Sequence, residues 1–269
     1  MRTSHKSFGA AVLALLLAIA LTACGSSSKN SGSSSGSSTT TASKQTLNVF
    51  GAASLKSAFT DLGRQFESDH PGTKVNFNFD SSTILAQQIQ DNPGTADVFA
   101  SADEKNMQAL QDAGEVTSKP VVFAKNQMEI AVEPGNPKGI KTVADLAKSD
   151  LTVVLCATEA PCGKYADQLL EQNNVKVTPK SRELNATSTL GKVSSGDADA
   201  AIVYVTDVKG AGSDVEGVAI PADQNVTATL PIAALKSSKN AALASEWVDF
   251  ITSNTTEKTL QQTYGFLAP

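Results

Sequence analysis

The stretch VFGAASLKSAF (residues 49–59) passes from a strand pattern to a helix pattern within a few residues. The β-branched and apolar run TLNVF (46–50) is typical of a buried strand. After Ser54 the apolar residues recur three and four positions apart, as they do along one face of an amphipathic helix. The segment NFNFDSSTILAQQI (76–89) makes the same transition, again with serines at the junction. The chain therefore places serines twice where a strand hands over to a helix.

Strands and helices continue to alternate along the chain. Further strand patterns and helix patterns follow in order at ADVFAS (96–101), 103–113, LTVVLC (151–156), KYADQLLEQN (164–173), STLGKVSSG (188–196) and ADAAIVYVTD (198–207). Such alternation predicts an α/β fold, in which mostly parallel sheets are flanked by helices on both faces.

Two long extended stretches interrupt this alternation, at 121–137 and 228–238. Because they bracket a middle block of strands and helices, we expect two lobes joined by two crossings, with the last helices returning to the first lobe. The predicted boundaries are 45–123 plus 236–269 for lobe 1 and 124–235 for lobe 2. In folds of this kind ligands lie between the lobes, outside the carboxyl ends of the strands.

The N-terminus has the pattern of a secretion signal. Arg2 and Lys6 precede the apolar run FGAAVLALLLAIAL (8–21), which is too short to remain as a membrane-spanning helix. The following Leu-Thr-Ala-Cys resembles the lipobox of bacterial lipoproteins, in which the chain is cut before the Cys and its sulfur carries a lipid. We therefore predict a lipoprotein signal peptide at 1–23 and lipidation of Cys24; the alternative is an ordinary signal peptide with a chance Cys.

A Gly- and Ser-rich segment follows, and we predict a flexible tether over 24–44. No second long apolar run occurs, so the folded part is expected to lie on the outer face of the cytoplasmic membrane, held by its lipid. Removing 1–23 deletes two positive charges and no acid, so the formal charge moves from −5 to −7. An acidic chain without a basic run argues against nucleic acid as a partner, and any anion site in it must use local dipoles.

Cys156 and Cys162 are separated by six positions in CATEAPC. Outside the membrane such a pair is most simply a small disulfide loop. A metal site is the weaker alternative, because zinc takes four ligands and His70 is the only His after the predicted cleavage point. We predict a Cys156–Cys162 disulfide and no directly bound metal cation.

The serines at the junctions have two interpretations. As single residues, Ser54 and Ser82 would be helix N-caps. A helix start also leaves about four unpaired N–H groups and carries roughly half a positive charge, which suits an anion. Two more helix starts are expected after strands, at CATEAPCGKY (156–165) and NATST (185–189). Four such starts predict a cage of neutral donors around an oxyanion.

Several motifs in order resemble the periplasmic molybdate-binding proteins of ABC transporters over essentially all of 45–269. The motifs are VFGAASL, SSTILAQQI, ADVFASAD, ATEAPCGKYA, AAIVYVTDV and the final YGF. The resemblance implies the two-lobed type II periplasmic-binding fold, with a tetrahedral molybdate or tungstate dianion held by hydroxyls and main-chain N–H groups in the cleft. It also implies a permease and its ATPase as partners. We expect no cofactor and take a monomer as the default.

The resemblance assigns the ligands residue by residue. Hydroxyl ligands fall on Ser54 in AAS, on Ser82 before LAQQI, and on Tyr204 in IVYVTD; by its residue type alone, Tyr204 would more simply pack in the core. Main-chain donors fall on Cys162, in the Pro-x-Gly-x-Tyr-Ala turn, and on Ala186, for which Asn185 is the alternative. If Cys162 is bonded to Cys156, the disulfide rigidifies this anion-facing loop.

Asp80 departs from the family pattern, in which a small neutral residue is common. A carboxylate in the site would repel a dianion, although it would also accept the proton of a hydrogen phosphate. Strand alternation from Phe79 places Asp80 on the opposite face, which favours a role at the surface or as a cap. Phosphate and sulfate remain the alternative ligands at this stage.

Other classes of function fit less well. A serine hydrolase needs a general base, but His70 lies in a DHPG turn and no G-x-S-x-G motif occurs. A Ser–Lys pair would need Lys56 or Lys192 to be buried, and both lie at polar positions of helix patterns. A purely structural surface lipoprotein disagrees with the ordered motifs and the two crossings. The sequence therefore indicates a transport protein and not an enzyme.

Overall fold

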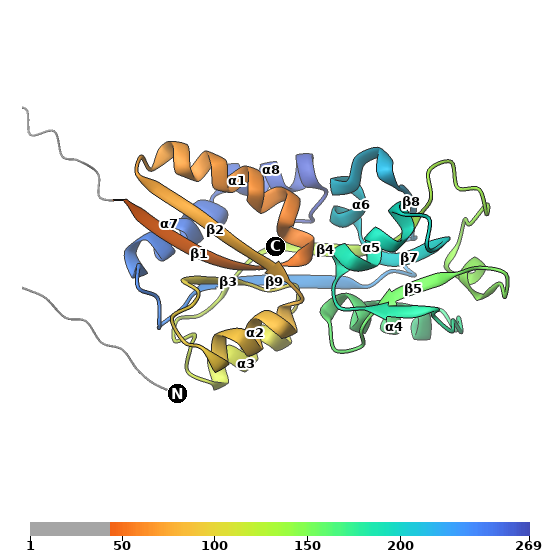
Figure 1. Cartoon of the computed structure of the whole chain (residues 1–269), viewed down its shortest axis with the longest axis horizontal. Helices are drawn as coiled ribbons and strands as arrows, with labels where there is room; N and C mark the ends of the chain where they lie inside the picture. The colour runs from red at the N-terminus through yellow and green to blue at the C-terminus, as the bar shows by residue number, and fades with distance from the viewer. Residues whose placement is uncertain (1–43) are drawn as a thin grey trace, which may run out of the picture. The chain divides into compact units, whose positions relative to one another are not determined.

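The computed structural model describes residues 44–269. The predicted signal peptide, the lipidation of Cys24 and the tether up to residue 43 lie outside the described residues. Within these residues nine strands form a sheet in the order β2-β1-β3-β9-β4-β7-β5-β6, with β8 also paired to β4 (Figure 1). The strands are β1 (Gln45–Ala52), β2 (Thr73–Asp80), β3 (Val98–Ala100), β4 (Val121–Val132), β5 (Val153–Cys156), β6 (Ser181–Glu183), β7 (Ala200–Tyr204), β8 (Glu216–Ala219) and β9 (Thr227–Ala234).

Helices cover both faces of this sheet, as the sequence predicts. The α-helices are α1 (Lys56–Asp69), α2 (Ser82–Asp91), α3 (Glu104–Asp112), α4 (Pro161–Gln172), α5 (Ala186–Ser194), α6 (Val205–Ala211), α7 (Ala241–Ile251) and α8 (Asn254–Thr259). Short 3-10 turns lie at η1 (Ala53–Leu55), η2 (Val143–Ala147) and η3 (Gly212–Asp214), and a π-helical turn, η4 (Leu260–Tyr264), follows α8. None of the helices in 44–269 has the length and apolarity that spanning a membrane requires.

The first half of the sheet brings its helix starts together at one edge. We use the term first half for β1–β3 with α1–α3, α7 and α8. Strands β1 and β2 are parallel and in register from Gln45 opposite Thr73 to Ala52 opposite Asp80. Because both strands end side by side, the η1 turn and helix α2 begin next to each other. The two strand–serine–helix junctions of the sequence are therefore spatial neighbours.

The second half consists of β5–β8 with α4–α6, in which β6, β5 and β7 are parallel. Strand β4 connects the halves: its residues 121–127 pair with β9, and its residues 128–132 pair with β7 and β8 (Figure 1). Both expected crossings, β4 and β9, are thus present. The residue numbers proposed for the lobe boundaries stay predictions.

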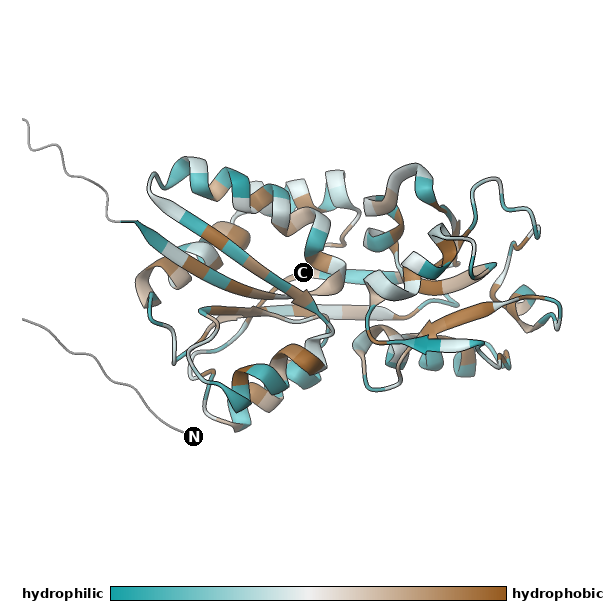
Figure 2. Cartoon of the chain, in the orientation of Figure 1, coloured by the Kyte–Doolittle hydropathy of each residue, from teal (hydrophilic) through white to brown (hydrophobic). Residues whose placement is uncertain are grey.

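The core of the first half is built around Trp247 on α7. Its indole is fully buried and packs edge-on against Phe59 and Phe66 of α1, at centroid distances of 5.7 and 5.2 Å. Phe77 of β2 contacts the same ring at 5.8 Å. Figure 2 shows hydrophobic residues along the strands and hydrophilic ones on the outer faces of the helices. The C-terminal helices return to the first half, as expected.

Two sequence expectations about element boundaries are wrong, and both corrections bear on the site. The strand expected at 198–207 ends at Tyr204, because the Tyr204 N–H donates to the Asp207 carboxylate (3.0 Å) and so closes the first turn of α6. The helix expected from residue 164 begins at Pro161, whose ring suits the first helical position. Strand β8 and helix α6 were not anticipated.

We predict that Trp247→Ala lowers the free energy of unfolding by about 3–5 kcal/mol, because it leaves a large cavity between α1, α7 and β2. Trp247→Phe should cost clearly less, since the buried indole N–H has no hydrogen-bond partner among the described residues. Urea denaturation followed by circular dichroism measures both. Equal losses for the two variants would contradict this account of the packing.

Candidate functional site

A small pocket lies where the helix starts of the two halves meet. It is lined by Ala52, Ala53, Ser54, Asp80, Ser81, Ser82, Ala102, Pro161, Cys162, Asn185, Ala186 and Tyr204. The structure thus brings all five residues assigned from the sequence (Ser54, Ser82, Cys162, Ala186 and Tyr204) to one place. They come from five separate segments, so only the tertiary fold makes them neighbours.

Five helix starts meet at this pocket, one more than the sequence predicts. Segments η1, α2, α4, α5 and α6 all begin at lining residues or directly after one. Each helix start offers N–H groups that have no carbonyl partner within the helix, together with a partial positive charge. No Lys or Arg is among the described residues that line the pocket. Its attraction for an anion therefore comes from neutral groups.

Buried hydroxyl groups without partners are concentrated here. Among the described residues, four buried side-chain polar atoms make no hydrogen bond: Ser54 Oγ, Ser81 Oγ, Tyr204 OH and Trp247 Nε1. The three hydroxyls all belong to this pocket, and their residues are at most 5 % exposed. A buried polar group left unpaired costs about 1–3 kcal/mol. Their shared location makes this pocket the candidate ligand site.

The pKa of the Tyr204 hydroxyl suits a hydrogen-bond donor. Burial, and secondly the neighbouring Tyr165 ring, raise the pKa of its hydroxyl well above the ordinary value. The group therefore keeps its proton at neutral pH and can donate it. Core packing, the simpler role considered for this residue, also applies, because its ring is buried.

Ser82 and Ser81 use their hydroxyls differently. Ser82 Oγ accepts a hydrogen bond from the Ala102 N–H (3.0 Å), which leaves its own proton available to donate. Ser81 is the N-cap residue of α2, yet its side chain makes no capping bond. Sequence reasoning assigned only Ser82 as a ligand and missed Ser81. The available clue was its place at the junction itself, directly before the first helical residue.

The predicted disulfide is present between Cys156, the last residue of β5, and Cys162, in the first turn of α4 (Cα–Cα 5.8 Å). Both residues are buried, and the Thr189 hydroxyl donates to Cys156 Sγ (3.2 Å). The bond fixes the turn before α4, where Cys162 lines the pocket. Within the described residues no group of three or more His, Cys, Asp or Glu could hold a metal ion.

The choice between Asn185 and Ala186 as main-chain donor favours Ala186. The Asn185 N–H already donates to Ser188 Oγ (3.3 Å), and the Asn185 side chain accepts from the Ser188 N–H (2.9 Å) as the N-cap of α5. Ala186 is the first residue of that helix, so its N–H has no helical partner.

The expectation that Asp80 faces away from the site is wrong. Its Oδ1 accepts from the Ser81 N–H (2.7 Å) and from Asn185 Nδ2 on the other half (2.8 Å), and the residue lines the pocket. Strand alternation distinguishes the two faces of a sheet. Asp80 is the last residue of β2, so its carboxylate reaches along the sheet edge to the helix starts.

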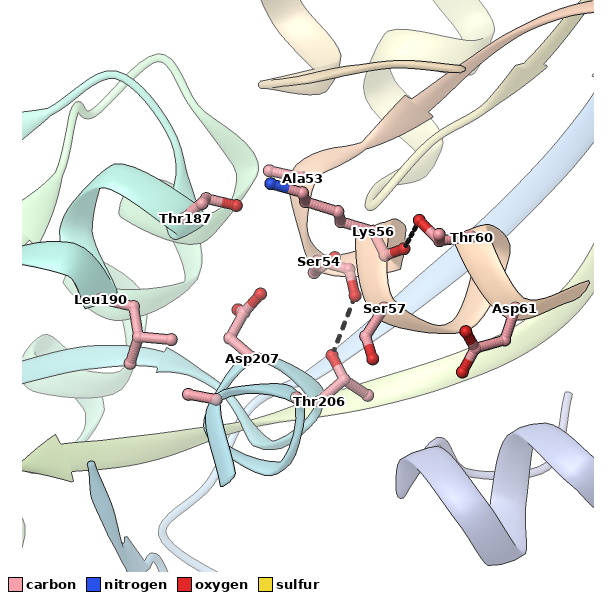
Figure 3. Close-up of a pocket in the computed structure, with 12 residues that line it drawn as sticks. Ala53, Ser54, Lys56, Ser57, Thr60, Asp61, Thr187, Leu190, Thr206 and Asp207 are labelled. Atoms are coloured by element: carbon pink, nitrogen blue, oxygen red, sulfur yellow. Dashed lines mark hydrogen bonds between the residues drawn. The ribbon is translucent and has the colours of Figure 1, made fainter. Parts of the chain in front are cut away.

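A larger cavity of about 400 Å³ adjoins this pocket and shares Ala53 and Ser54 with it (Figure 3). It lies between the start of α1 and helices α5 and α6, with Asp207 on its wall. Burial raises the pKa of the Asp207 carboxyl to about 7, although the Tyr204 N–H that donates to it acts in the opposite direction. In the same wall the Thr206 hydroxyl donates to the carbonyl oxygen of Ser54 (3.3 Å; Figure 3).

We predict that Asp207→Asn makes the protein more stable relative to wild type as the pH rises. An unfolded Asp has a pKa of about 3.9, so between about pH 4 and pH 7 the native state binds more protons than the unfolded state. Wild-type stability therefore falls through this window, by at most about 1.4 kcal/mol per pH unit, whereas Asn cannot ionise. Urea unfolding at the two ends of the window measures the difference.

Asp223→Asn, the same substitution at an exposed position, is the matched control. A stability difference between Asp207→Asn and wild type that does not change with pH would contradict the raised pKa of Asp207.

Comparison with known proteins gives consistent results. Residues 47–267 match the family model described as bacterial extracellular solute-binding protein. The molybdate-binding protein ModA of Mycobacterium tuberculosis strain H37Rv is 39% identical over 258 residues, covering 96% of this chain and 97% of the relative.

Two solved structures share the fold. The Azotobacter vinelandii periplasmic molybdate-binding protein superposes with a TM-score of 0.72 at 20% identity, covering 83% of this chain and 99% of that one. The sulfate-binding protein SubI of Mycobacterium tuberculosis superposes with a TM-score of 0.69 at 17% identity, covering 82% and 86%. At these identities the likeness concerns the fold alone, and it is similar for proteins named after different anions.

Proposed function

This chain belongs to the bacterial extracellular solute-binding protein family, and on that premise we propose that it captures molybdate for an ABC importer. Membership makes the chain a solute-binding protein and not an enzyme. The observation that carries the choice of ligand class is the group of three buried hydroxyls without partners at the meeting point of five helix starts. The identity of 39% to a protein named for molybdate binding supports the choice of anion.

The proposed site is made of neutral donors from both halves. Ser54, Ser81 and Ser82 donate hydroxyl protons from the first half. The second half contributes the Tyr204 hydroxyl and the main-chain N–H groups of Cys162 and Ala186. A tetrahedral dianion has four oxygens that must each be matched by donors, so geometry and size decide which anion is bound. Molybdenum is bound as its oxyanion, so the protein contacts its oxygens and no residue coordinates the metal directly.

Hydrogen phosphate and sulfate are the ligands that compete with molybdate for this site. A bound hydrogen phosphate needs an acceptor for its proton, and Asp80 is the only carboxylate among the described residues of the pocket lining. Its Oδ1 accepts two N–H groups, from Ser81 and Asn185, and its Oδ2 is the oxygen that remains to accept such a proton, so phosphate is included in the experiment. Sulfate has the charge and shape of molybdate with shorter bonds, so the experiment must include it as well. Tungstate, with the same charge and shape as molybdate, is proposed to bind as well.

The proposed transport cycle takes place at the membrane surface, where the lipid anchor is expected to hold the chain. We propose that Cys24 carries a lipid that holds the monomeric protein at the outer face of the cytoplasmic membrane. The two halves then close over the anion, and the closed form docks on the permease, which the ATPase drives. Closure brings the first-half hydroxyls and the second-half donors around one ion.

We predict that Ser81→Ala and Tyr204→Phe each weaken molybdate binding by about 10-fold, because each removes one hydrogen bond to a charged ligand. Neither variant should destabilise the ligand-free protein, since each removes a buried hydroxyl that has no protein partner. Calorimetric titration of the purified chain with molybdate, tungstate, sulfate and phosphate measures affinity and selectivity together.

Ser57→Ala is the matched control, because Ser57 lines the larger cavity and not the pocket. Its affinity should equal that of wild type. Wild-type binding of sulfate or phosphate in preference to molybdate would overturn the proposed ligand, and unchanged affinity in both pocket variants would overturn the proposed site.

A further inference from the structure

We infer that Asp80 and Asn185 are positioning residues that form a latch across the pocket and slow the departure of the bound anion. The inference rests on the proposed function and adds to it a pair of residues that need not touch the ligand. The two side chains are 105 positions apart in sequence and come from different halves, yet Asn185 Nδ2 donates to Asp80 Oδ1 at 2.8 Å.

The orientation of the Asn185 side chain is set by its role as a helix cap. Its Oδ1 accepts from the N–H of Ser188, so its Nδ2 must point away from α5. In that direction lies Asp80, whose Oδ1 also accepts from the N–H of Ser81 (2.7 Å). Both partners are therefore held in place by their own half before they meet. A contact between preorganised groups loses little conformational entropy when it forms.

Each latch residue directly precedes a proposed anion donor. Asp80 is followed by Ser81 and Ser82, and Asn185 is followed by Ala186. The latch thus fixes the distance between the first-half hydroxyls and the start of α5. An anion held by both sets of donors cannot leave until the halves separate, and separation breaks the Asp80–Asn185 bond.

The latch also explains why a carboxylate lies beside a proposed dianion site, where its charge is unfavourable. Asp80 contributes a negative charge to a pocket whose other lining residues, within the described part of the chain, carry no ionised side chain. By Coulomb repulsion it lowers the affinity for any anion. Its two hydrogen bonds from N–H groups offset part of this cost, and the bond to the other half is the contribution that a neutral small residue would not make.

Other contacts also join the halves, and one of them, from Thr206 Oγ1 to the carbonyl oxygen of Ser54 (3.3 Å), reaches the main chain of a proposed donor residue. Thr83 Oγ1 donates to the carbonyl oxygen of Glu159 (2.7 Å), and Lys164 Nζ lies 3.6 Å from Asp103 Oδ2. Thr83, Glu159, Lys164 and Asp103 are all absent from the pocket lining. Among the side-chain pairs described, the Asp80–Asn185 pair is the one that spans the pocket itself.

The test measures the dissociation rate of isotopically labelled molybdate from the purified chain, chased with unlabelled molybdate. Asn185→Ser keeps an N-cap residue but is too short to reach Asp80, and it leaves the charge of the pocket unchanged. We expect the dissociation rate to rise about 10-fold, as for the loss of a hydrogen bond to a charged group, with little change in the association rate. Asn76→Ser, at an exposed position of β2, is the control and should dissociate like wild type.

Asp80→Asn distinguishes the effect of the Asp80–Asn185 hydrogen bond from the effect of the negative charge of Asp80. Its amide oxygen still accepts from Ser81 and Asn185, while the repulsion is gone, so the dissociation rate should rise by less than in Asn185→Ser. In the double variant the Asn185→Ser change should have a smaller effect than it has alone, because the charged acceptor is absent.

Equal dissociation rates for wild type and Asn185→Ser would overturn the latch. The latch would also be overturned if Asn185→Ser released molybdate faster and its ligand-free form lost the same amount of free energy of unfolding. That result would report the loss of the helix cap of α5. A wild type that binds no molybdate would overturn the proposed function and the latch with it. Wild-type binding with an unaffected Asn185→Ser overturns the latch alone.

Discussion

Unpaired main-chain N–H groups at the starts of helices are the constraint on which the rest of this structure depends. Every helix start leaves donors that need a partner, and five of them are collected at one pocket at the carboxyl ends of the strands. Parallel strands make this arrangement possible, because neighbouring strands end at the same edge. The buried hydroxyls of Ser54, Ser81 and Tyr204 add further donors there. The anion proposed as ligand would supply acceptors for part of this set of donors.

The crossing strand β4 is linked directly to these donors. Asn126, fully buried on β4, donates through Nδ2 to Thr206 Oγ1 (2.8 Å), and Thr206 donates to the carbonyl oxygen of Ser54 (3.3 Å). Thr206 lies in the first turn of α6, two residues after Tyr204. These two hydrogen bonds connect β4 to the first turn of α6 and to the main chain of Ser54, so they join the two halves beside the pocket.

Two carboxylates lie near the proposed anion site, and their surroundings differ. Asp80 is half-buried at the sheet edge and accepts two N–H groups, one from each half. Asp207 is buried behind Tyr204, and desolvation raises its pKa to about 7, which reduces its negative charge at neutral pH. Neutral donors discriminate between anions by geometry, and acidic groups close to them sharpen the requirement for a full set of hydrogen bonds.

Local patterns were enough to predict the alternating strands and helices, the two crossings, the Cys156–Cys162 bond, and the serine junctions at 54 and 82. These features depend on residues close together in the chain, where periodicity and turn residues are informative. The start of α6 at Tyr204, the free hydroxyl of Ser81 and the inward turn of Asp80 were not predictable in this way. Each depends on a partner that is distant in sequence or on the end of a strand, where alternation no longer applies. The meeting of five segments at one pocket was a matter of register and packing, which only the folded chain fixes.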